Sequence, residues 1–421
     1  MGKYSITGGI RLGGDVAVGG CKNAVLPILA ATVLTGKRSI IHNCPNISDT
    51  HVSMEILRHL GCDVVYDGYS LVVDSGGASP RELPEKHVAK MRSSIIFAGS
   101  LLSRFGRIET TFPGGCELGA RPLDLHLAAF ERMGVVFDNS DECFIKGAAN
   151  KLSGAKIELG MASVGATQNI MLAAVLADGD TIIKNAAREP EIIDLQNFLN
   201  MAGAKVYGAG TAEIFIQGVK TLRSVEYEIM PDRIVAGTYL AAGAITRGHI
   251  SLKNVRFDDM TNVVARLVAM GASVREDGKD ITLKMKSRPI ALAHLCTGPH
   301  PAFPTDMQPQ FAALLATARG RSVVTENMFE ARDAHIDELL KMGCNIKKFN
   351  SQRFFIEGVG RLRAAEVAAK DLRGGAALVL AGLIAEGETV VDNIHYIERG
   401  YEDIQRDLQA LGARIALTTA E

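Results

Sequence analysis

A lysine lies between a glycine pair and an apolar helical stretch near the start of the chain, in Gly19-Gly20-Cys21-Lys22-Asn23-Ala24. A cation beside the free backbone N–H groups of a helix start can bind a phosphate or carboxylate group. The sequence therefore predicts an anion site at Lys22, with Asn23 beside it. A solvated surface lysine is the competing interpretation.

A cysteine lies in a segment rich in glycine and proline, residues 112–122, that shows no hydrophobic periodicity. We expect a mobile surface loop with the Cys116 thiol at its tip. Arg121 follows closely and could tune this thiol, because thiol reactivity depends on pKa and exposure. Pro122 fits the first turn of a helix expected at 123–127. An unreactive cysteine is the alternative.

Asp306 follows a proline-stiffened turn and precedes the helical stretch that contains Phe311. A carboxylate at this place can act as a general base or simply cap the helix, and both interpretations stay open.

Four arginines precede or open expected helices, namely Arg92, Arg332, Arg373 and Arg399. A single arginine of this kind is most often a surface ion-pair partner that contributes little. Their recurrence at the junctions of a repeated structure favours anion binding.

Composition and missing motifs exclude several classes of protein. With 46 basic and 47 acidic residues, the net charge of −1 argues against a nucleic-acid partner. No apolar run approaches the roughly 20 residues that span a bilayer, and no secretory signal is visible, so we expect no membrane partner. P-loop, GxGxxG, GxSxG and HExxH motifs are missing, and the ten histidines lack metal-ligand spacing. We therefore expect no metal and no cofactor. Seven scattered cysteines without CxxC pairing indicate a reducing, cytoplasmic compartment.

An internal repeat dominates the organisation of the chain. A helical stretch, a glycine and a β-rich run recur at Gly61, Gly134, Gly203, Gly271, Gly343 and Gly412, with spacings of 73, 69, 68, 72 and 69 residues. A second series, Gly36, Gly106, Gly179, Gly248, Gly320 and Gly387, has spacings of 70, 73, 69, 72 and 67. Each glycine is expected at a helix C-terminus, where a positive φ is useful. Two independent series indicate six repeats of about 70 residues, each with two helices and about four strands.

The chain begins with two strands and ends just after one, so the first strands should complete the last repeats. We expect an α/β protein with two lobes of three repeats each. Lobe one covers 22–230 and carries the Cys116 loop, and lobe two covers 1–21 and 231–421. A ligand is expected in a cleft between lobes, which is a common place for one.

Seven segments match a known family. They are Cys21-Lys22-Asn23-Ala24, Pro113-Gly114-Gly115-Cys116, Gly119-Ala120-Arg121-Pro122, Ser163-Val164-Gly165-Ala166-Thr167, Arg188-Glu189-Pro190-Glu191, Pro304-Thr305-Asp306-Met307-Gln308 and Arg399-Gly400-Tyr401. Over essentially the whole chain, the sequence resembles the UDP-N-acetylglucosamine 1-carboxyvinyltransferases, the MurA family of enolpyruvyl transferases. The resemblance implies an inside-out α/β barrel in each lobe, with helices inside and sheets outside.

The resemblance also implies a reaction. The enolpyruvyl group of phosphoenolpyruvate would move to the 3-hydroxyl of UDP-N-acetylglucosamine by addition and elimination, with release of phosphate. This is the first committed step of peptidoglycan synthesis, so roles in cell wall biogenesis, cell shape and cell division follow. Phosphoenolpyruvate carries roughly three negative charges, and arginine can grip its carboxylate and phosphate at two points. The residues that match the family's phosphoenolpyruvate positions are Lys22, Asn23, Arg121 and Arg399.

Two residues match the family's proton-transfer groups. Cys116 corresponds to the proton donor, which fosfomycin would alkylate, and Asp306 to the carboxylate that takes the hydroxyl proton. The catalytic set implied is Cys116, Asp306, Lys22 and Arg399.

The matching positions for the nucleotide sugar are Arg92, Arg121, Pro122, Leu123, Asp124, Leu125, Ser163, Val164, Gly165, Asp306 and Met328. The sequence departs from the family at Met161, where some members have lysine, so a contact to the diphosphate is lost. It departs again at Ala331, where many members have asparagine before Arg332.

Two alternatives remain from the residues. A transferase for shikimate 3-phosphate would need extra cations and would lack the loop cysteine. A non-catalytic repeat scaffold would have no reason to place Lys22, Cys116, Asp306 and Arg399 on separate junctions.

Overall fold

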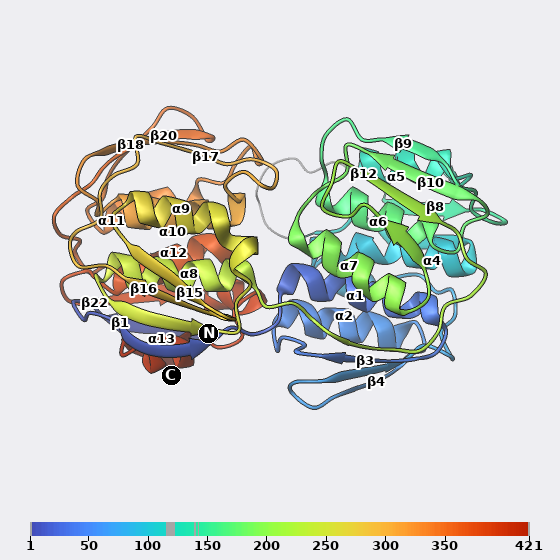
Figure 1. Cartoon of the computed structure of the whole chain (residues 1–421), viewed down its shortest axis with the longest axis horizontal. Helices are drawn as coiled ribbons and strands as arrows, with labels where there is room; N and C mark the ends of the chain where they lie inside the picture. Colours follow the sequence, from blue (N-terminus) through green and yellow to red (C-terminus); the bar gives the residue numbers. More distant parts are fainter. Residues whose placement is uncertain (1, 115–122, 139, 142, 420–421) are drawn as a thin grey trace. The chain divides into compact units, whose positions relative to one another are not determined.

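The computed structural model describes residues 2–114, 123–138, 140–141 and 143–419. Strands within these ranges form six separate sheets, five of four strands and one of three (Figure 1). Six sheets for six repeats confirm the predicted α/β class and its repeated construction. The chain divides into two compact lobes: Gly20–Gly115 with Arg121–Met230, called lobe one, and Met1–Gly19 with Pro231–Glu421, called lobe two.

Lobe one contains three sheets, with strand orders β13-β3-β5-β4, β6-β8-β7 and β11-β12-β10-β9. Its strands are β3 (Arg38–His42), β4 (Asp63–Tyr66), β5 (Leu71–Asp74), β6 (Arg107–Thr111), β7 (Val136–Asp138), β8 (Phe144–Ala148), β9 (Lys156–Glu158), β10 (Asp180–Lys184), β11 (Lys205–Tyr207), β12 (Glu213–Gln217) and β13 (Val225–Glu228). Its helices are α1 (Lys22–Thr35), α2 (Ser48–His59), α3 (Glu85–Val88), η1 (Arg92–Ile96), α4 (Phe97–Phe105), α5 (Asp124–Arg132), α6 (Val164–Ala174) and α7 (Pro190–Met201).

Lobe two contains the sheets β21-β22-β1-β23, β15-β16-β14-β2 and β17-β18-β20-β19. Its strands are β1 (Gly2–Thr7), β2 (Gly13–Ala17), β14 (His249–Lys253), β15 (Ser273–Asp277), β16 (Asp280–Lys284), β17 (His294–Cys296), β18 (Arg321–Thr325), β19 (Asn345–Lys348), β20 (Arg353–Glu357), β21 (Glu366–Ala368), β22 (Glu388–Asp392) and β23 (Arg414–Thr419). Its helices are α8 (Arg233–Ile245), η2 (Phe257–Met260), α9 (Thr261–Ala269), η3 (Thr305–Met307), α10 (Gln308–Leu315), α11 (Ala334–Lys341), α12 (Leu372–Gly382), η4 (Ile394–Arg399) and α13 (Ile404–Ala410).

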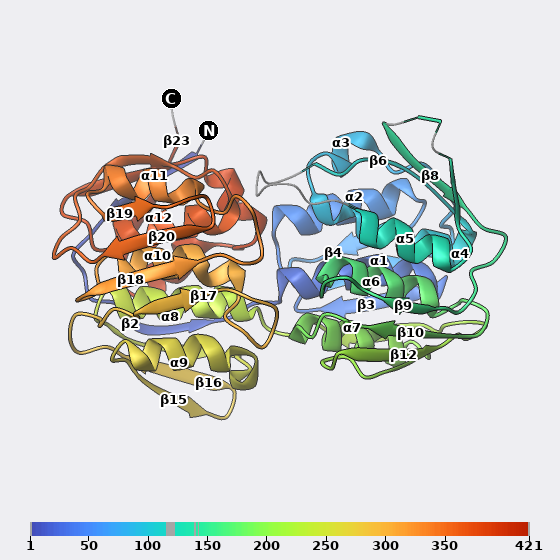
Figure 2. The same cartoon turned by 90° about the horizontal axis from the view of Figure 1, so that it is seen from above.

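In each lobe, buried helices form the interior and sheets form the outside (Figures 1 and 2). Helices α1, α8 and α12 are apolar on every side and are buried along nearly their whole length. Strands instead alternate, as in the buried and exposed residues of β12. A helix that is apolar all round needs burial on all sides, and a strand with one apolar face can cover it.

The chain's first strands belong to lobe two. Strand β1 lies between β22 and β23, so that Ile6 pairs with both Thr389 and Ile415. Strand β2 runs parallel to β14, with Asp15 opposite Ser251.

One sheet departs from the predicted four strands. The sheet β6-β8-β7 has only three strands. A fourth strand would lie beside β6 near Leu83, whose backbone N–H donates to the Glu109 carbonyl. Pro80 and Pro84 flank this residue. Proline has no N–H to donate and fixes φ, so the segment cannot extend into a strand.

The predicted positive φ is found at eleven of the twelve repeat glycines and is wrong for Gly248. The preceding residue, Arg247, takes φ 57° instead. Gly248 is required for a different reason, since a Cβ there would lie 2.3 Å from the Leu12 carbonyl oxygen. This junction therefore needs a residue with positive φ at Arg247 and a residue without a Cβ at Gly248.

Candidate active site

Lys22 is the first residue of α1 and is only 9% exposed, so the solvated-lysine interpretation is wrong. Its Nζ lies 2.7 Å from a carboxylate oxygen of Asp49, which is in the first turn of α2 and is also buried. Gly20 permits this arrangement, because a Cβ there would lie 1.8 Å from the Asn43 carbonyl oxygen. The close approach brings the connection between β3 and α2 against the start of α1, where Asn23 is the second residue.

Several predicted nucleotide-sugar residues gather around His126 in lobe one. Gly165 lies in the first turn of α6, and a Cβ on it would meet His126 Cε1 at 3.2 Å. Arg92 opens η1 and acts electrostatically on the same histidine. His126 follows Leu123, Asp124 and Leu125 at the start of α5. The structure therefore brings these predicted residues together.

The predicted nucleotide-sugar residues Ser163, Val164 and Gly165 lie at a helix start. Ser163 is the N-cap of α6, and its Oγ accepts a hydrogen bond from the Ala166 backbone N–H. Val164 and Gly165 are the first two helical residues. Their N–H groups lie at the positive end of the helix, which suits an anionic ligand.

His126 is neutral at physiological pH. Burial, together with the charge of Arg92, lowers the pKa of its imidazole to about 4. Its Nδ1 lies 2.8 Å from Asn169 Nδ2, whose side-chain oxygen accepts from the Gly99 N–H. An amide nitrogen can only donate, so Nδ1 accepts and Nε2 carries the proton.

Asp306 in lobe two binds two arginines. Its Oδ1 lies 2.9 Å from Arg332 Nη2, and its Oδ2 lies 3.1 Å from Arg373 Nη2. Both guanidinium groups are buried, at 4% and 2% exposure of their side chains. The interpretations of Asp306 as a helix cap and of these two arginines as surface residues are therefore wrong; neither η3 nor α10 has a side-chain cap.

The pKa of Asp306 is set by opposing effects. Burial would raise this pKa, but the charges of Arg373 and Arg332 outweigh burial and lower it well below its usual range. The same pairing raises the pKa of Arg373, against the effect of its burial. Asp306 is therefore ionised, and in this arrangement it is a weak base.

Glu326 joins Asp306 to the segment that contains Met328. One of its oxygens accepts from Thr305 Oγ1 at 2.9 Å, and the other accepts from the Met328 backbone N–H at 2.8 Å. Thr305 in turn accepts from Arg332 Nη1 at 2.6 Å. Because Glu326 is 1% exposed, its carboxylate holds both segments in place from within the core.

Arg399 is the last residue of η4 and is half-buried. Two residues later, the Tyr401 ring lies 5.7 Å from the Arg373 guanidinium carbon. The Tyr401 hydroxyl is 2.8 Å from Thr238 Oγ1 in α8. These contacts connect the end of η4 to the Asp306 cluster.

Three predicted residues, Cys116, Arg121 and Pro122, lie outside the described residues, as does most of the expected 112–122 loop. The two departures from the family are visible: Met161 is 53% exposed, and Ala331 is half-buried beside the paired Arg332.

Sequence reasoning missed three charged or polar residues of the site. Asp49, Glu326 and His126 contact predicted residues, but each looks ordinary in the sequence. Asp49 lies in a segment that resembles any helix start, and Glu326 follows an ordinary strand-like run. Only His126, next to the predicted 123–125 segment, could have been found by its position.

The described ranges contain no group of three or more His, Cys, Asp and Glu side chains able to hold a metal ion. Within the same ranges, no helix has the length and apolar character needed to cross a membrane.

Comparisons with known proteins agree with one another. The family model of EPSP synthase (3-phosphoshikimate 1-carboxyvinyltransferase) matches residues 6–408. UDP-N-acetylglucosamine 1-carboxyvinyltransferase 2 of Caldanaerobacter subterraneus subsp. tengcongensis is 47% identical, over 99% of each chain. UDP-N-acetylglucosamine 1-carboxyvinyltransferase of Desulfovibrio desulfuricans is 44% identical, again over 99% of each chain.

Solved structures resemble the whole chain. The enolpyruvyl transferase NikO from Streptomyces tendae superposes with a TM-score of 0.90 at 26% identity, covering 100% of this chain and 99% of that one. EPSP synthase from Acinetobacter baumannii gives a TM-score of 0.74 at 18% identity with 100% of both chains covered, a similarity of fold alone. The predicted two-lobed fold is confirmed.

Proposed function

Because the chain belongs to the EPSP synthase family and, within it, to the UDP-N-acetylglucosamine 1-carboxyvinyltransferases, we infer that it transfers the enolpyruvyl group of phosphoenolpyruvate to UDP-N-acetylglucosamine. The observation that carries this proposal is the 47% identity over 99% of both chains. The reaction is a step of peptidoglycan synthesis, and it uses only small-molecule substrates. A cytoplasmic location is part of the same proposal.

The charges of the described residues support an anionic substrate. Lys22, Arg332 and Arg373 are all buried near helix N-termini, where the backbone also favours anions. Buried cations of this kind are costly unless they are paired. We propose Lys22, Asn23, Arg121 and Arg399 as the groups that bind phosphoenolpyruvate.

The proposed reaction begins with proton transfer. Cys116 gives a proton to the methylene carbon of phosphoenolpyruvate, and the adjacent carbon becomes cationic. The 3-hydroxyl oxygen of the sugar attacks that carbon while its proton goes to Asp306. The C–O bond to phosphate in the tetrahedral ketal then breaks, and one proton of the methyl group returns to the Cys116 thiolate, which restores the carbon–carbon double bond and the thiol. Cations stabilise the departing phosphate.

Asp306 must become more basic for this step, since its two ion pairs lower its pKa. The Nε of Arg332 is buried and has no hydrogen-bond partner among the described residues. We propose that an anionic substrate group binds there and draws Arg332 away from the carboxylate. Loss of one guanidinium partner would raise the pKa of Asp306 by about 1–3 units.

For the nucleotide sugar, we propose Arg92, Arg121, 122–125, 163–165, Asp306 and Met328. His126 belongs with this set, because its Nε2–H lies beside Gly165 at the start of α6. The two lobes are proposed to act as domains, 22–230 with the Cys116 loop and 1–21 with 231–421.

Phosphate release tests the function directly. The protein should release phosphate from phosphoenolpyruvate when UDP-N-acetylglucosamine is added, and none when shikimate 3-phosphate is added. The opposite preference would favour the shikimate enzyme that gives the family model its name. No release with either acceptor would leave the non-catalytic scaffold.

A further inference from the structure

Lobe two contains a pocket of about 450 Å³ that shares no residue with the proposed active site. Its volume is within the range of ordinary ligand sites. The lining comes from the β1–β2 connection, the turn from α8 into β14, and the end of β16; the residues are Arg11, Leu12, Arg247, Gly248, His249, Lys284, Met285 and Lys286. Leu12 and Met285 are buried at 2% and 1% exposure, so charged side chains make the accessible surface.

Cations converge on this pocket without compensating carboxylates. Its lining has four permanent positive charges, one histidine and no acidic residue. Within the described part of the chain, these five side chains take part in no ion pair or side-chain hydrogen bond. Asp15 on the paired strand β2 lies opposite Ser251 and acts on Lys253, which is not part of the pocket.

The other repeats show that this accumulation is not required by the fold. In every sheet, the first residue of the strand that follows the repeat glycine has an antiparallel partner. The six pairs are Arg38 with Asp74, Arg107 with Ala148, Asp180 with Gln217, His249 with Lys284, Arg321 with Glu357, and Glu388 with Thr7. All six pairs lie among the described residues. Only His249 with Lys284 places two basic side chains opposite each other.

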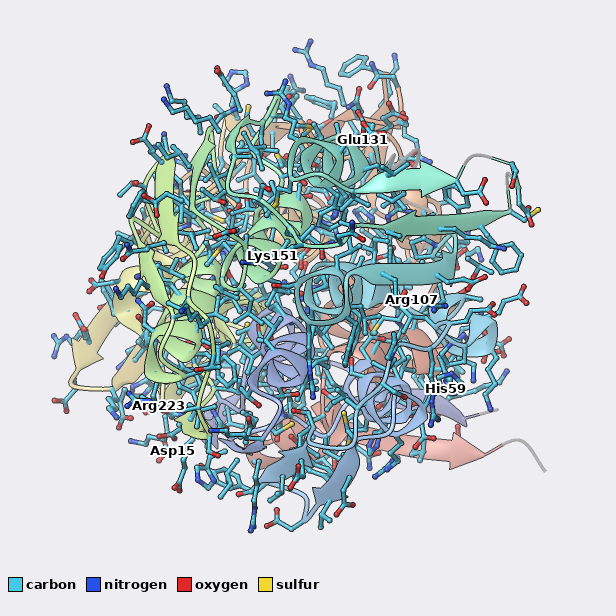
Figure 3. All side chains as sticks on the ribbon, turned by 90° about the vertical axis from the view of Figure 1, so that its right-hand side faces the viewer. Asp15, His59, Arg107, Glu131, Lys151 and Arg223 are labelled. Atoms are coloured by element: carbon cyan, nitrogen blue, oxygen red, sulfur yellow. The ribbon has the colours of Figure 1, made fainter. Side chains whose placement is uncertain are left out.

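Three cations at junctions of other repeats have acidic partners. Arg321 Nε lies 2.9 Å from Glu357, and Arg361 Nη1 lies 2.8 Å from Glu386. Lys151, labelled in Figure 3 on the surface of lobe one, lies 3.2 Å from Asp178. The basic pocket has none of these ion pairs. Arg319, which precedes Gly320 as Arg247 precedes Gly248, also has no ion pair among the described residues, so the pocket is distinguished by its four unpaired cations together.

The backbone of Arg247 adds an independent cost. Five described non-glycine residues have positive φ, and the other four are asparagine, which tolerates this conformation best. An arginine there is strained, and strained residues concentrate at functional sites. Gly248 cannot relieve the strain, because Leu12 already occupies the space around it.

The pocket and the Asp306 cluster lie at opposite ends of α8. The N-cap of this helix, Asp232, acts on the charge of Arg373, whereas Arg247 follows the helix C-terminus. The 13 residues of α8 separate the two ends by about 20 Å. The C-terminal dipole contributes roughly half a negative charge, which offsets only a small part of four cations.

We propose that this pocket binds a polyanion through its phosphate groups, either a soluble phosphorylated metabolite or the headgroup of an acidic phospholipid. Two arginine forks and two lysines suit phosphate oxygens, and four charges favour a ligand with several negative charges. No Phe or Tyr ring lines the pocket, and His249 is the one aromatic side chain in its lining, so the four cations favour phosphate over a base. The ligand neutralises the charges of Arg11, Arg247, Lys284 and Lys286. This inference does not depend on the proposed reaction.

The first test is calorimetric titration of the full chain with inorganic pyrophosphate, with UDP-N-acetylglucosamine present at saturation. The variant Arg247→Asn/Lys284→Gln removes two pocket cations. Its matched control, Arg319→Asn/Lys347→Gln, removes two exposed cations from other parts of lobe two. We expect the pocket variant to bind pyrophosphate roughly tenfold more weakly for each cation removed, whereas the control and the turnover of both variants stay unchanged.

Thermal unfolding gives a second readout. Arg247→Asn alone should raise the melting temperature of the ligand-free protein by about 2–4 °C, because asparagine relieves the backbone strain. Pyrophosphate should then stabilise this variant less than the wild type. A variant that is less stable and equally responsive to pyrophosphate contradicts the proposal.

Vesicles distinguish the two sources of phosphate. Wild-type protein is sedimented with phosphatidylcholine vesicles with and without phosphatidylglycerol. Binding that needs phosphatidylglycerol and is lost in the double variant identifies a lipid headgroup. Pyrophosphate binding without vesicle binding identifies a soluble ligand. Equal pyrophosphate affinity in the wild type, the double variant and the control overturns the proposal, whatever the vesicles show.

Discussion

Replacing Asp306 with asparagine tests the charge balance of lobe two. The substitution keeps the size of the side chain and removes the negative charge that both Arg332 and Arg373 contact at about 3 Å. Two buried guanidinium groups would then lie together without a carboxylate. We expect proton transfer from the sugar hydroxyl to be lost and the lobe itself to become less stable.

The size of the stability loss follows from burial. Removing one partner of a buried ion pair costs about 3–5 kcal/mol, because the remaining charge stays desolvated. A lobe of this size changes its melting temperature by about 2–4 °C per kcal/mol. The melting temperature of lobe two should therefore fall by roughly 6–20 °C at pH 7.

The loss should depend on pH with a definite sign. The folded pKa of Asp306 is lowered, so its stabilising effect is complete above the unfolded value of about 4 and is lost as pH falls below it. In that range the unfolded wild type binds a proton that the folded form does not. The difference between wild type and Asp306→Asn should shrink by about 1.4 kcal/mol per pH unit below pH 4.

Calorimetric unfolding between pH 3 and pH 7 measures both effects. Asp258→Asn is the control, since Asp258 is an exposed carboxylate of the same lobe. A loss under about 1 kcal/mol at pH 7 would refute the buried-pair argument. A difference that stays constant down to pH 3 would refute the lowered pKa.

Three further predictions concern other parts of the chain. Gly248→Ala should destabilise the protein by about 1–3 kcal/mol in denaturant unfolding, because its Cβ would meet the Leu12 carbonyl at 2.3 Å; Gly160→Ala, where nothing lies within 4 Å, should be neutral. Fosfomycin should add to Cys116 by mass spectrometry, since burial raises the pKa of Cys62 to about 11 and of Cys344 to about 12; an adduct on exposed Cys143 or Cys296 would count against the loop assignment. Lys22→Ala should abolish turnover and lower stability by up to about 3–5 kcal/mol, because the buried Asp49 carboxylate loses the Lys22 ammonium group, and Lys22→Met/Asp49→Leu should recover stability but no activity.

The repeats could be predicted from sequence because their signals are local. A glycine after a helical stretch and a β-branched run after the glycine are readable within a few residues. Gly248 shows the limit of this reasoning: its neighbour Leu12 is 236 residues away in the chain. The missing fourth strand had a local signal in Pro80 and Pro84, but the repeat pattern favoured a strand there.

The site was predictable in its residues and less so in its contacts. Lys22 and Asp306 stand out as charged groups near helix starts. Their partners are less visible, because Asp49 lies on the next helix of the same repeat and Arg373 comes from another repeat. A sequence shows which cations exist, but only packing decides which carboxylates neutralise them. For that reason the burial of Arg332 and the weak basicity of Asp306 could not be foreseen.

The two proposed anion sites should respond differently to salt, because one depends on buried groups and the other on exposed ones. Among the groups proposed for phosphoenolpyruvate, Lys22 is only 9% exposed, so dissolved ions screen its interactions poorly. The pocket cations are exposed, and the helix end beside them carries the unfavourable dipole. Raising the salt from 0.01 M to about 0.15 M shortens the screening length from about 30 Å to about 8 Å. Pyrophosphate affinity at the pocket should then fall by more than tenfold, while the KM for phosphoenolpyruvate should rise far less. If salt changed the pyrophosphate affinity and the KM by the same factor, exposed and buried cations would be screened equally. That result would contradict the argument from burial.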